Sequence, residues 1–467
     1  MRASPPLAVL ASGLTLLAAL LAAPAHGLAL RLDRAASAVL ALSGSPARAG
    51  EAAPLALSLT DPAGAPLAGA TVTLERRVAG TWQPLATVVT DAAGAGAAAL
   101  PMSTVADDNV VRASYAGDGT QPPATSPEVA VPLVRWRSRV VLDAPRKVRD
   151  EQAITLSVRW ATAAGAPVSG PVRVQERTRR GWRTLAEVVT DAAGAATVTA
   201  TPRTDTAYRA DAPALDWVDG DTSTRARVDN VPPVSPVSVR GAPRPRVRLP
   251  AQPRAVEAGA HARVGPVPDG VWRSMVGRSW RPGCPVGREG LRLLRTNYVG
   301  YDGYRHRGEL VVAASAAPAF ASLFTELHDR RIPVRSMYRV DRFGWSPRLH
   351  GADDVRSMAA GNTSAFNCRH VVGRPGVRSP HAWGRALDLN PWENPYRVGG
   401  RWLPNAWWAG RSHPRVAWRG RGHAVVQVLR RHGFRWTYGT MDSQHFDAPG
   451  GARITTRLSA RCHGVCH

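Results

Sequence analysis

An internal repeat constrains the N-terminal half of this chain more than any other feature of its 467 residues. The sequence Val-Val-Thr-Asp-Ala-Ala-Gly occurs at residues 88–94 and again at 188–194, and a Gly-Ala-Pro turn precedes it in both places. A period of about 100 residues is that of a sandwich domain and is too long for the unit of a solenoid. We therefore predict two copies of one domain, over residues 28–131 and 132–233.

Each copy contains short alternating runs of apolar and polar residues, such as 70–75, separated by Gly, Pro and Asp turns. Such runs are typical of antiparallel strands and predict no helix. The copies resemble the bacterial immunoglobulin-like repeats of secreted proteins, although neither contains a cysteine pair. The resemblance implies two all-β sandwiches that act as a spacer or a wall anchor and take no part in catalysis.

The first 27 residues have the composition of an export signal. Met1 and Arg2 precede an Ala/Leu-rich run, and Ala23-Pro-Ala25 offers a small-residue cleavage site. These features predict a signal peptide over residues 1–27. The alternative is an uncleaved membrane anchor, because the run is nearly long enough to span a bilayer. With the signal removed, we expect a secreted, wall-associated protein that has no membrane span.

The formal net charge of +25 comes from 60 basic and 35 acidic residues. Such a charge suits an anionic partner, which is either nucleic acid or the teichoic acids and peptidoglycan carboxylates of a bacterial wall. Because the signal peptide predicts export, we expect anionic wall polymers and no nucleic acid as partners.

The four cysteines fit an oxidising compartment and allow at most two disulfides. Three pairings are possible from the sequence, and we favour Cys284 with Cys368 and Cys462 with Cys466. The C-terminal Cys-His-Gly-Val-Cys-His segment is alternatively a metal ligand set, but its spacing lacks a second Cys/His pair.

Residues 234–270 are rich in Pro, Val, Arg and Ala, a composition that predicts an extended linker without a core. The last domain follows over residues 271–467. Apolar residues at i, i+3, i+4 and i+7 predict helices in it over 320–327 and 422–431. Predicted strands over 308–312 and 332–338 accompany these helices, so that the domain is of the α+β class.

Two short segments in the last domain carry metal-ligand chemistry. After Gly384, which permits a tight turn, alternation predicts a strand in which the leucines at 387 and 389 face the core and Asp388 faces the other way. His381 precedes this strand, and His445 lies on a second strand-like segment. Two histidines and one aspartate predict a zinc site with an open fourth position. Asp447 is either a hydrogen-bond partner of this site or an exposed acid.

A zinc site of this kind activates water at neutral pH, and hydrolysis then needs two further groups. Asp442 lies three residues before His445, which suits a general base beside the metal. A cation must hold a substrate carboxylate or the developing oxyanion. Arg369 is the first candidate for this cation and Arg335 the second.

The pattern Ser379-x-His381-x-x-Gly-x-Ala-x-Asp388, with the later Asp442-x-x-His445, resembles the zinc D-alanyl-D-alanine carboxypeptidases of the VanY kind. It is similar also to their L-alanyl-D-glutamate endopeptidase relatives in phage lysins. The resemblance implies one zinc per chain on the two histidines and Asp388, with Asp442 as base where many carboxypeptidases have Glu. Ser379 joins Arg335 as a substrate-binding candidate.

The resemblance implies a multidomain protein, in which two all-β immunoglobulin-like sandwiches precede an α+β zinc peptidase domain. Its expected activity is that of a D-alanyl-D-alanine carboxypeptidase acting on peptidoglycan stem peptides. The alternatives are an L-alanyl-D-glutamate-type endopeptidase and a non-catalytic wall-binding protein. A serine carboxypeptidase would need Ser-x-x-Lys, but the residue three before the single lysine, Lys147, is Ala144.

Overall fold

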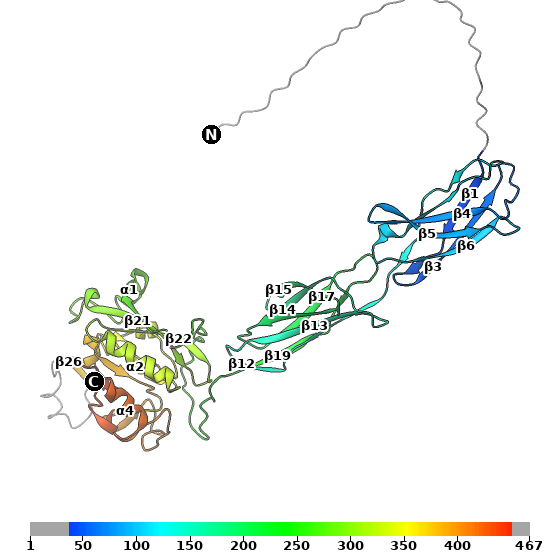
Figure 1. Cartoon of the computed structure of the whole chain (residues 1–467). Coiled ribbons are helices and arrows are strands. Elements are labelled where there is room, and N and C mark those ends of the chain that lie inside the picture. The colour runs from blue at the N-terminus through cyan, green and yellow to red at the C-terminus, as the bar shows by residue number, and fades with distance from the viewer. Residues whose placement is uncertain (1–36, 451–467) are drawn as a thin grey trace, which may run out of the picture. The chain divides into compact units, whose positions relative to one another are not determined.

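The computed structural model describes residues 37–450. The predicted signal peptide and the predicted Cys462–Cys466 pair lie outside the described residues, and both stay predictions. Figure 1 shows two regions made of strands, followed along the chain by a region of mixed helices and strands. By its internal contacts the chain divides into two units, and the second repeat has parts in both. No helix among the described residues has the length and apolar character needed to cross a membrane.

The first repeat consists of two main sheets, with strand orders β1-β3-β6 and β5-β4-β7-β8. Strand β9 also pairs with β7, and a short parallel pair joins β2 and β10. Its elements are β1 (Val39–Gly44), β2 (Ala47–Arg48), β3 (Ala52–Thr60), β4 (Thr71–Val78), β5 (Thr81–Val89), β6 (Ala95–Pro101), the 3₁₀ turn η1 (Ala106–Asp108), β7 (Val110–Tyr115), β8 (Ala124–Thr125), β9 (Val129–Ala130) and β10 (Leu133–Val134).

The second repeat has the corresponding sheets, with strand orders β11-β13-β16 and β12-β19-β17-β14-β15. Its elements are β11 (Ser138–Asp143), β12 (Lys147–Arg149), β13 (Ile154–Thr162), β14 (Pro171–Thr178), β15 (Gly181–Val189), β16 (Ala195–Ala200), β17 (Thr206–Ala212), β18 (Asp221–Thr222) and β19 (Ala226–Val231).

Alternation along the strands builds each sandwich core. In β3, Leu55, Leu57 and Leu59 are buried while the residues between them face outward. The three leucines pack with Val72 and Leu74 of β4 in the opposite sheet. A period of two therefore places the apolar side chains on the inner face, as the sequence predicts.

The repeated Val-Val-Thr-Asp-Ala-Ala-Gly sequence forms the same turn in both copies. Asp91 accepts hydrogen bonds from the backbone N–H groups of Ala93 and Ala95, each at 2.9 Å. Asp191 accepts the equivalent pair in the second copy. The glycine that ends the sequence has a positive φ in both places, a conformation that favours glycine. The repeat is thus conserved between the copies in its turn as well as in its strands.

The last region contains an antiparallel sheet of order β20-β21-β22, against which helix α2 packs. A separate antiparallel pair joins β27 and β30. The elements are β20 (Arg263–Pro266), α1 (Asp269–Met275), η2 (Arg288–Gly290), β21 (Leu291–Val299), β22 (Arg305–Ala313), α2 (Ala317–Asp329), η3 (Val340–Phe343), β23 (Trp345–Ser346), β24 (Gly351–Ala352), α3 (Asp354–Ala359), β25 (His370–Val371), β26 (Arg374–Arg378), η4 (Pro380–Trp383), β27 (Ala386–Asp388), β28 (Tyr396–Val398), β29 (Arg401–Leu403), α4 (Ala424–Arg431), η5 (Gly439–Met441) and β30 (His445–Asp447).

Both predicted helices and one of the two predicted strands are present, as α2, α4 and β22. The strand predicted over 332–338 is wrong, because this segment belongs to no named strand. Its backbone N–H groups have mixed partners: that of Arg335 donates to Asn390 Oδ1 at 2.9 Å and that of Tyr338 to Asn362 Oδ1 at 2.7 Å, whereas that of Val334 donates to the backbone oxygen of Val299. Side chains thus supply several of the acceptors that a neighbouring strand would provide in a ladder.

The segment 234–270, predicted as a linker, lies along the last region. The indole N–H of Trp392 donates to Pro243 O at 2.7 Å, and the side chain of Gln252 donates to Met337 O at 2.8 Å. Residues 263–266 of the segment form β20 and pair with β21. The sheet of the last region therefore begins before residue 271.

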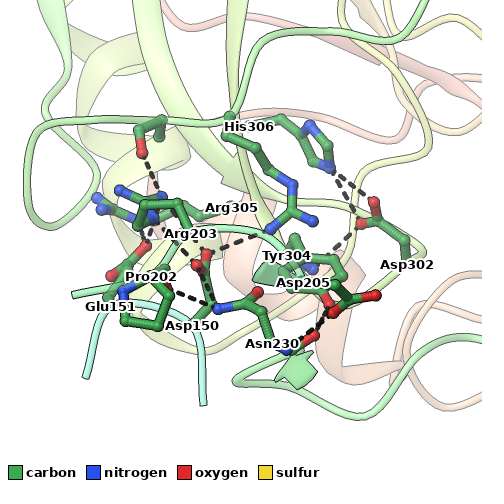
Figure 2. Close-up of polar contacts among 12 residues, drawn as sticks. Asp150, Glu151, Pro202, Arg203, Asp205, Asn230, Asp302, Tyr304, Arg305 and His306 are labelled. Atoms are coloured by element: carbon green, nitrogen blue, oxygen red, sulfur yellow. Dashed lines mark hydrogen bonds and ion pairs between the residues drawn. The ribbon is translucent and has the colours of Figure 1, made fainter. Parts of the chain in front are cut away.

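A network of polar contacts joins residues of the second repeat to residues 254–305, all within the second unit (Figure 2). The buried carboxylate of Asp150 accepts from Arg203 Nε at 3.0 Å and from Arg254 at 3.3 Å. Glu151 accepts from Arg305 Nε at 2.8 Å. Two arginines around Asp150 supply the partners that a buried carboxylate needs.

Candidate metal centre

The pairing of β27 with β30 brings two of the predicted ligands together. In this antiparallel register Asp388 lies opposite His445, and Leu387 lies opposite Phe446. Leu387 and Phe446 enter the apolar core on one face. Because side chains alternate across a strand, Asp388 and His445 share the other face. His381, on η4 just before β27, completes the group.

Local structure explains how η4 presents His381. The hydroxyl of Ser379 accepts a hydrogen bond from the backbone N–H of His381 at 3.3 Å and so caps η4. Gly384 ends η4 with φ 67°, and a Cβ at this position would lie 2.7 Å from the backbone nitrogen of Ala313. A larger residue at 384 would thus collide with β22. Ser379 is buried, and its part in substrate binding remains a prediction.

The three ligand side chains meet at one point. His381 Nε2 lies 3.2 Å from His445 Nδ1 and 3.2 Å from Asp388 Oδ2, and His445 Nδ1 lies 3.2 Å from Asp388 Oδ1. Ligands about 2.0–2.1 Å from a tetrahedral zinc ion are separated from each other by about 3.3 Å. All three side chains are at most 1% exposed. The spacing and the donor types therefore fit a single zinc ion.

The outer nitrogens of both histidines also have partners. His381 Nδ1 lies 2.6 Å from the carbonyl oxygen of Ala365, and His445 Nε2 lies 3.2 Å from Asp447 Oδ1. Such partners orient a ligating imidazole and hold the proton on its outer nitrogen. The lone pairs of His381 Nε2 and His445 Nδ1 then point towards Asp388. Asp447 is therefore a partner of the site and not simply an exposed acid.

The charges in the cluster support each other. Burial alone would raise the pKa of Asp388, but the two histidines hold this pKa well below its usual range. Burial alone would lower the pKa of His445, but Asp388 and Asp447 raise it to about 10. The carboxylates thus stabilise positive charge at this place. A metal cation can take the position that a proton otherwise occupies.

Residues 372–448 match the family model described as D-alanyl-D-alanine carboxypeptidase. This range includes all three members of the triad and Asp442. The C-terminal region contains a domain of the D-alanyl-D-alanine carboxypeptidase family. The triad thus lies in the part of the chain that the family model covers.

A second family model matches an earlier range of the chain. A model described as lipoprotein LpqB beta-propeller domain matches residues 179–290, where the structure has the sandwich strands β15 to β19 followed by β20 and α1. No curated protein matches the chain.

Three solved structures show low similarity to this chain. The first is a tetra-tandem repeat in the extending region of a large adhesion protein, with a TM-score of 0.30 and 12% identity over 59% of this chain and 64% of that chain. The second is invasin, a bacterial integrin-binding protein, with a TM-score of 0.30 and 14% identity over 58% of this chain and 48% of that chain. The third is the superoxide reductase neelaredoxin of Ignicoccus hospitalis, with a TM-score of 0.16 and 14% identity over 20% of this chain and 79% of that chain. This chain thus spans less than two thirds of the adhesion protein and of invasin. At these TM-scores none of the three supports an argument about function.

Asp442 follows η5 in the carboxypeptidase-family domain and is fully buried. Its backbone forms a bridge with Tyr396, and its carbonyl oxygen lies 3.4 Å from the backbone nitrogen of His445. The chain therefore turns sharply between Asp442 and the ligand three residues later. This turn joins the buried Asp442 to the strand that carries His445, and the role of Asp442 as general base remains a prediction.

Neither predicted arginine has a described contact with the triad. The guanidinium of Arg369 is buried and lies 2.7 Å from Asp354 Oδ2. Arg335 pairs with the buried Glu393, and its guanidinium lies over the ring of Tyr301 at 4.1 Å. The roles of both arginines in substrate binding remain predictions. Nothing in the sequence pattern around Asp354 or Glu393 indicates these pairs, which join segments far apart in the chain.

The predicted disulfide between Cys284 and Cys368 is present, with the two Cα atoms 6.0 Å apart. It ties the loop before η2 to the segment that continues into Arg369. No cysteine among the described residues is free.

Proposed function

We propose that this chain is an exported zinc metallopeptidase that hydrolyses peptide bonds in peptidoglycan stem peptides, as a D-alanyl-D-alanine carboxypeptidase. The observation that carries the proposal is the buried triad of His381, Asp388 and His445, whose spacing fits zinc and which lies in the family-matched residues. When bound, zinc supplies Lewis-acid chemistry that activates water at neutral pH. The Cys284–Cys368 disulfide supports export, because such bonds persist in oxidising compartments.

Asp442 is the proposed general base. It accepts a proton from the attacking water and delivers this proton to the amine that leaves. Asp442 is buried, and its backbone contacts the backbone of His445, which supports a position beside the proposed metal. Arg369 is the proposed cation for the substrate, and its pairing with Asp354 fixes the guanidinium in one place.

The same triad also serves an L-alanyl-D-glutamate-type endopeptidase, so the cleaved bond requires an experiment. Purified peptidoglycan should be digested with the whole protein, and the released fragments identified by mass. Free D-alanine supports the carboxypeptidase, and a new internal amine supports the endopeptidase. Absence of both products from a zinc-loaded protein would favour the non-catalytic wall-binding protein.

The two immunoglobulin-like repeats are proposed to hold the enzyme at the wall through anionic polymers. Their buried side chains are mostly apolar, and no group of potential metal ligands lies in them among the described residues. Sedimentation with isolated cell walls, compared between the whole protein and a protein lacking residues 28–233, tests this role. Equal retention of both would contradict it.

A further inference from the structure

A cluster of cationic and aromatic side chains lies on the surface of the carboxypeptidase-family domain. It consists of Arg281, Trp345, His350, His370 and Arg378, here called the Trp345 cluster. The guanidinium of Arg281 lies 5.6 Å from the centre of the Trp345 ring, and this ring meets His350 edge-on at 6.4 Å. His350 in turn stacks on His370, with ring centres 4.8 Å apart and 26° between the planes.

The two arginines of the cluster converge on the disulfide. Arg281 donates to the carbonyl oxygen of Cys368 at 2.9 Å. Arg378 donates to Gly283 O at 2.9 Å and lies 3.6 Å from the sulfur of Cys368. Arg378 also pairs with His370 across β25 and β26. Strand pairing and the contacts with the disulfide-bonded segments therefore bring Arg281, His370 and Arg378 together.

The positive charge of the cluster is not compensated. None of its four basic side chains forms an ion pair with a carboxylate in the part of the chain that the structure describes, residues 37–450. In the same domain, Arg335 and Arg369 each pair with a buried carboxylate. Guanidinium groups that bond to no carboxylate keep other N–H donors for a ligand. The cluster is therefore suited to an anion.

The aromatic part of the cluster is also accessible. Trp345 is 39% exposed, and no other tryptophan among residues 37–450 is exposed to this degree. His350 and Arg378 are exposed, and Arg281 and His370 are half-buried. An exposed indole beside a stacked imidazole pair offers flat apolar faces, on which the C–H face of a sugar ring can pack. The combination of such faces with paired guanidinium groups suits a sugar that carries a phosphate.

We propose that the Trp345 cluster is a binding site for a phosphate-bearing glycan, with a sugar ring on Trp345 and a phosphate held by Arg281 and Arg378. Two guanidinium groups match the double charge of a phosphate better than the single charge of one carboxylate. Arg378 lies three residues before His381, so the bound glycan lies on the strand pair that continues into the metal-ligand segment. The proposal does not depend on catalysis, because it uses none of the triad residues.

Three soluble polymers test the site on the whole protein: phosphorylated mannan, the same mannan without phosphate, and inorganic polyphosphate. We expect phosphorylated mannan to bind at least about 10-fold more tightly than either of the others at equal ionic strength. Equal binding of polyphosphate would show a charge effect alone and would overturn the sugar site. Equal binding of unphosphorylated mannan would overturn the phosphate site.

Variants then locate the site. Trp345→Ala and Arg378→Gln should each weaken phosphorylated-mannan binding by about 10-fold, and Trp345→Phe should restore most of the loss because it keeps a flat ring. Arg430→Gln is the matched control, since Arg430 is exposed at the end of α4 and lies outside the cluster. It removes the same charge and should change affinity less than 2-fold. Equal losses in Arg378→Gln and Arg430→Gln would overturn the proposal, and unchanged thermal unfolding of each variant confirms its fold.

Discussion

The repeats and the carboxypeptidase-family domain use their polar side chains in different ways. In the repeats, Asp91 and Asp191 occupy equivalent turns, and each carboxylate accepts hydrogen bonds from backbone N–H groups two and four residues later. In the domain, the partners come from separate segments, as with Arg369 and Asp354 or His381 and Ala365. These two carboxylates of the repeats thus complete local turns, whereas these side chains of the domain join separate segments.

This difference predicts where substitutions affect chemistry and where they affect only stability. A polar residue that completes a turn can be replaced by another turn former. A polar residue that helps to build the candidate metal centre has a role that its shape alone cannot supply.

The largest effect should follow from Asp442→Asn, which keeps the shape of the side chain and removes its basicity. A positioned general base contributes typically about 100- to 10,000-fold, and the loss should appear mainly in kcat. Zinc content and thermal unfolding should not change. Steady-state kinetics on a soluble stem peptide, with metal analysis of the same sample, measure this.

The control is Asp353→Asn, because Asp353 caps α3 and Asn caps equally well. Near-normal turnover by Asp442→Asn would show that Asp442 has only a structural role.

A smaller effect is expected from Asp447→Asn, which removes the charge opposite His445 Nε2. Loss of such a partner typically weakens metal binding by about 10- to 100-fold. Competition with a chromophoric chelator measures the zinc affinity, with Asp329→Asn as control because Asp329 is an exposed acid beside His328. If both variants bind zinc equally well, Asp447 does not tune the metal centre.

The sequence predicts the sandwich repeats and the triad for physical reasons that act over short distances. Alternation fixes the faces of β3, and the Ser379-to-Asp388 spacing fixes the turn before β27. The pairs that Arg369 and Arg335 form could not be predicted, because their partners lie 15 and 58 residues away without a periodic relation. The strand wrongly predicted over 332–338 has the same origin, since several acceptors for its backbone N–H groups are side chains from distant segments.

A core substitution in the first repeat tests whether this repeat affects stability alone and leaves turnover unchanged. Leu74 is fully buried between the two sheets, so Leu74→Ala should destabilise this repeat by about 2–5 kcal/mol. Because the first repeat contains no part of the triad, turnover of a soluble peptide should stay within about 2-fold of the parent. Calorimetry should show an earlier transition for the repeat alone. A parallel loss of turnover would show that the first repeat supports the active site.

The smallest effect concerns Glu326 on α2. Its carboxylate pairs with Arg330, with Arg431 at the end of α4 and with His432, the residue after α4. The hydrogen bond from Arg431 is the main cause that lowers its pKa to about 2, from a usual value of 4.5. A lowered carboxylate pKa stabilises the folded state above pH 4.5, and this stabilisation disappears as the pH falls through about 2. The group is partly exposed, and its charges are screened by salt.

Glu326→Gln should therefore reduce the unfolding free energy at pH 7 by only about 1 kcal/mol, and less at high salt. The difference from the parent should shrink between pH 4.5 and pH 2, since protonated Glu and Gln then carry the same charge. Urea unfolding at pH 7, 4.5 and 2.5 measures this trend, with Glu289→Gln as control because Glu289 has no ion pair among the described residues. A difference that grows as the pH falls would contradict the charge pairing between α2 and α4. Such a result would also mean that this edge of the domain, unlike the metal centre, is held together mainly by its apolar contacts.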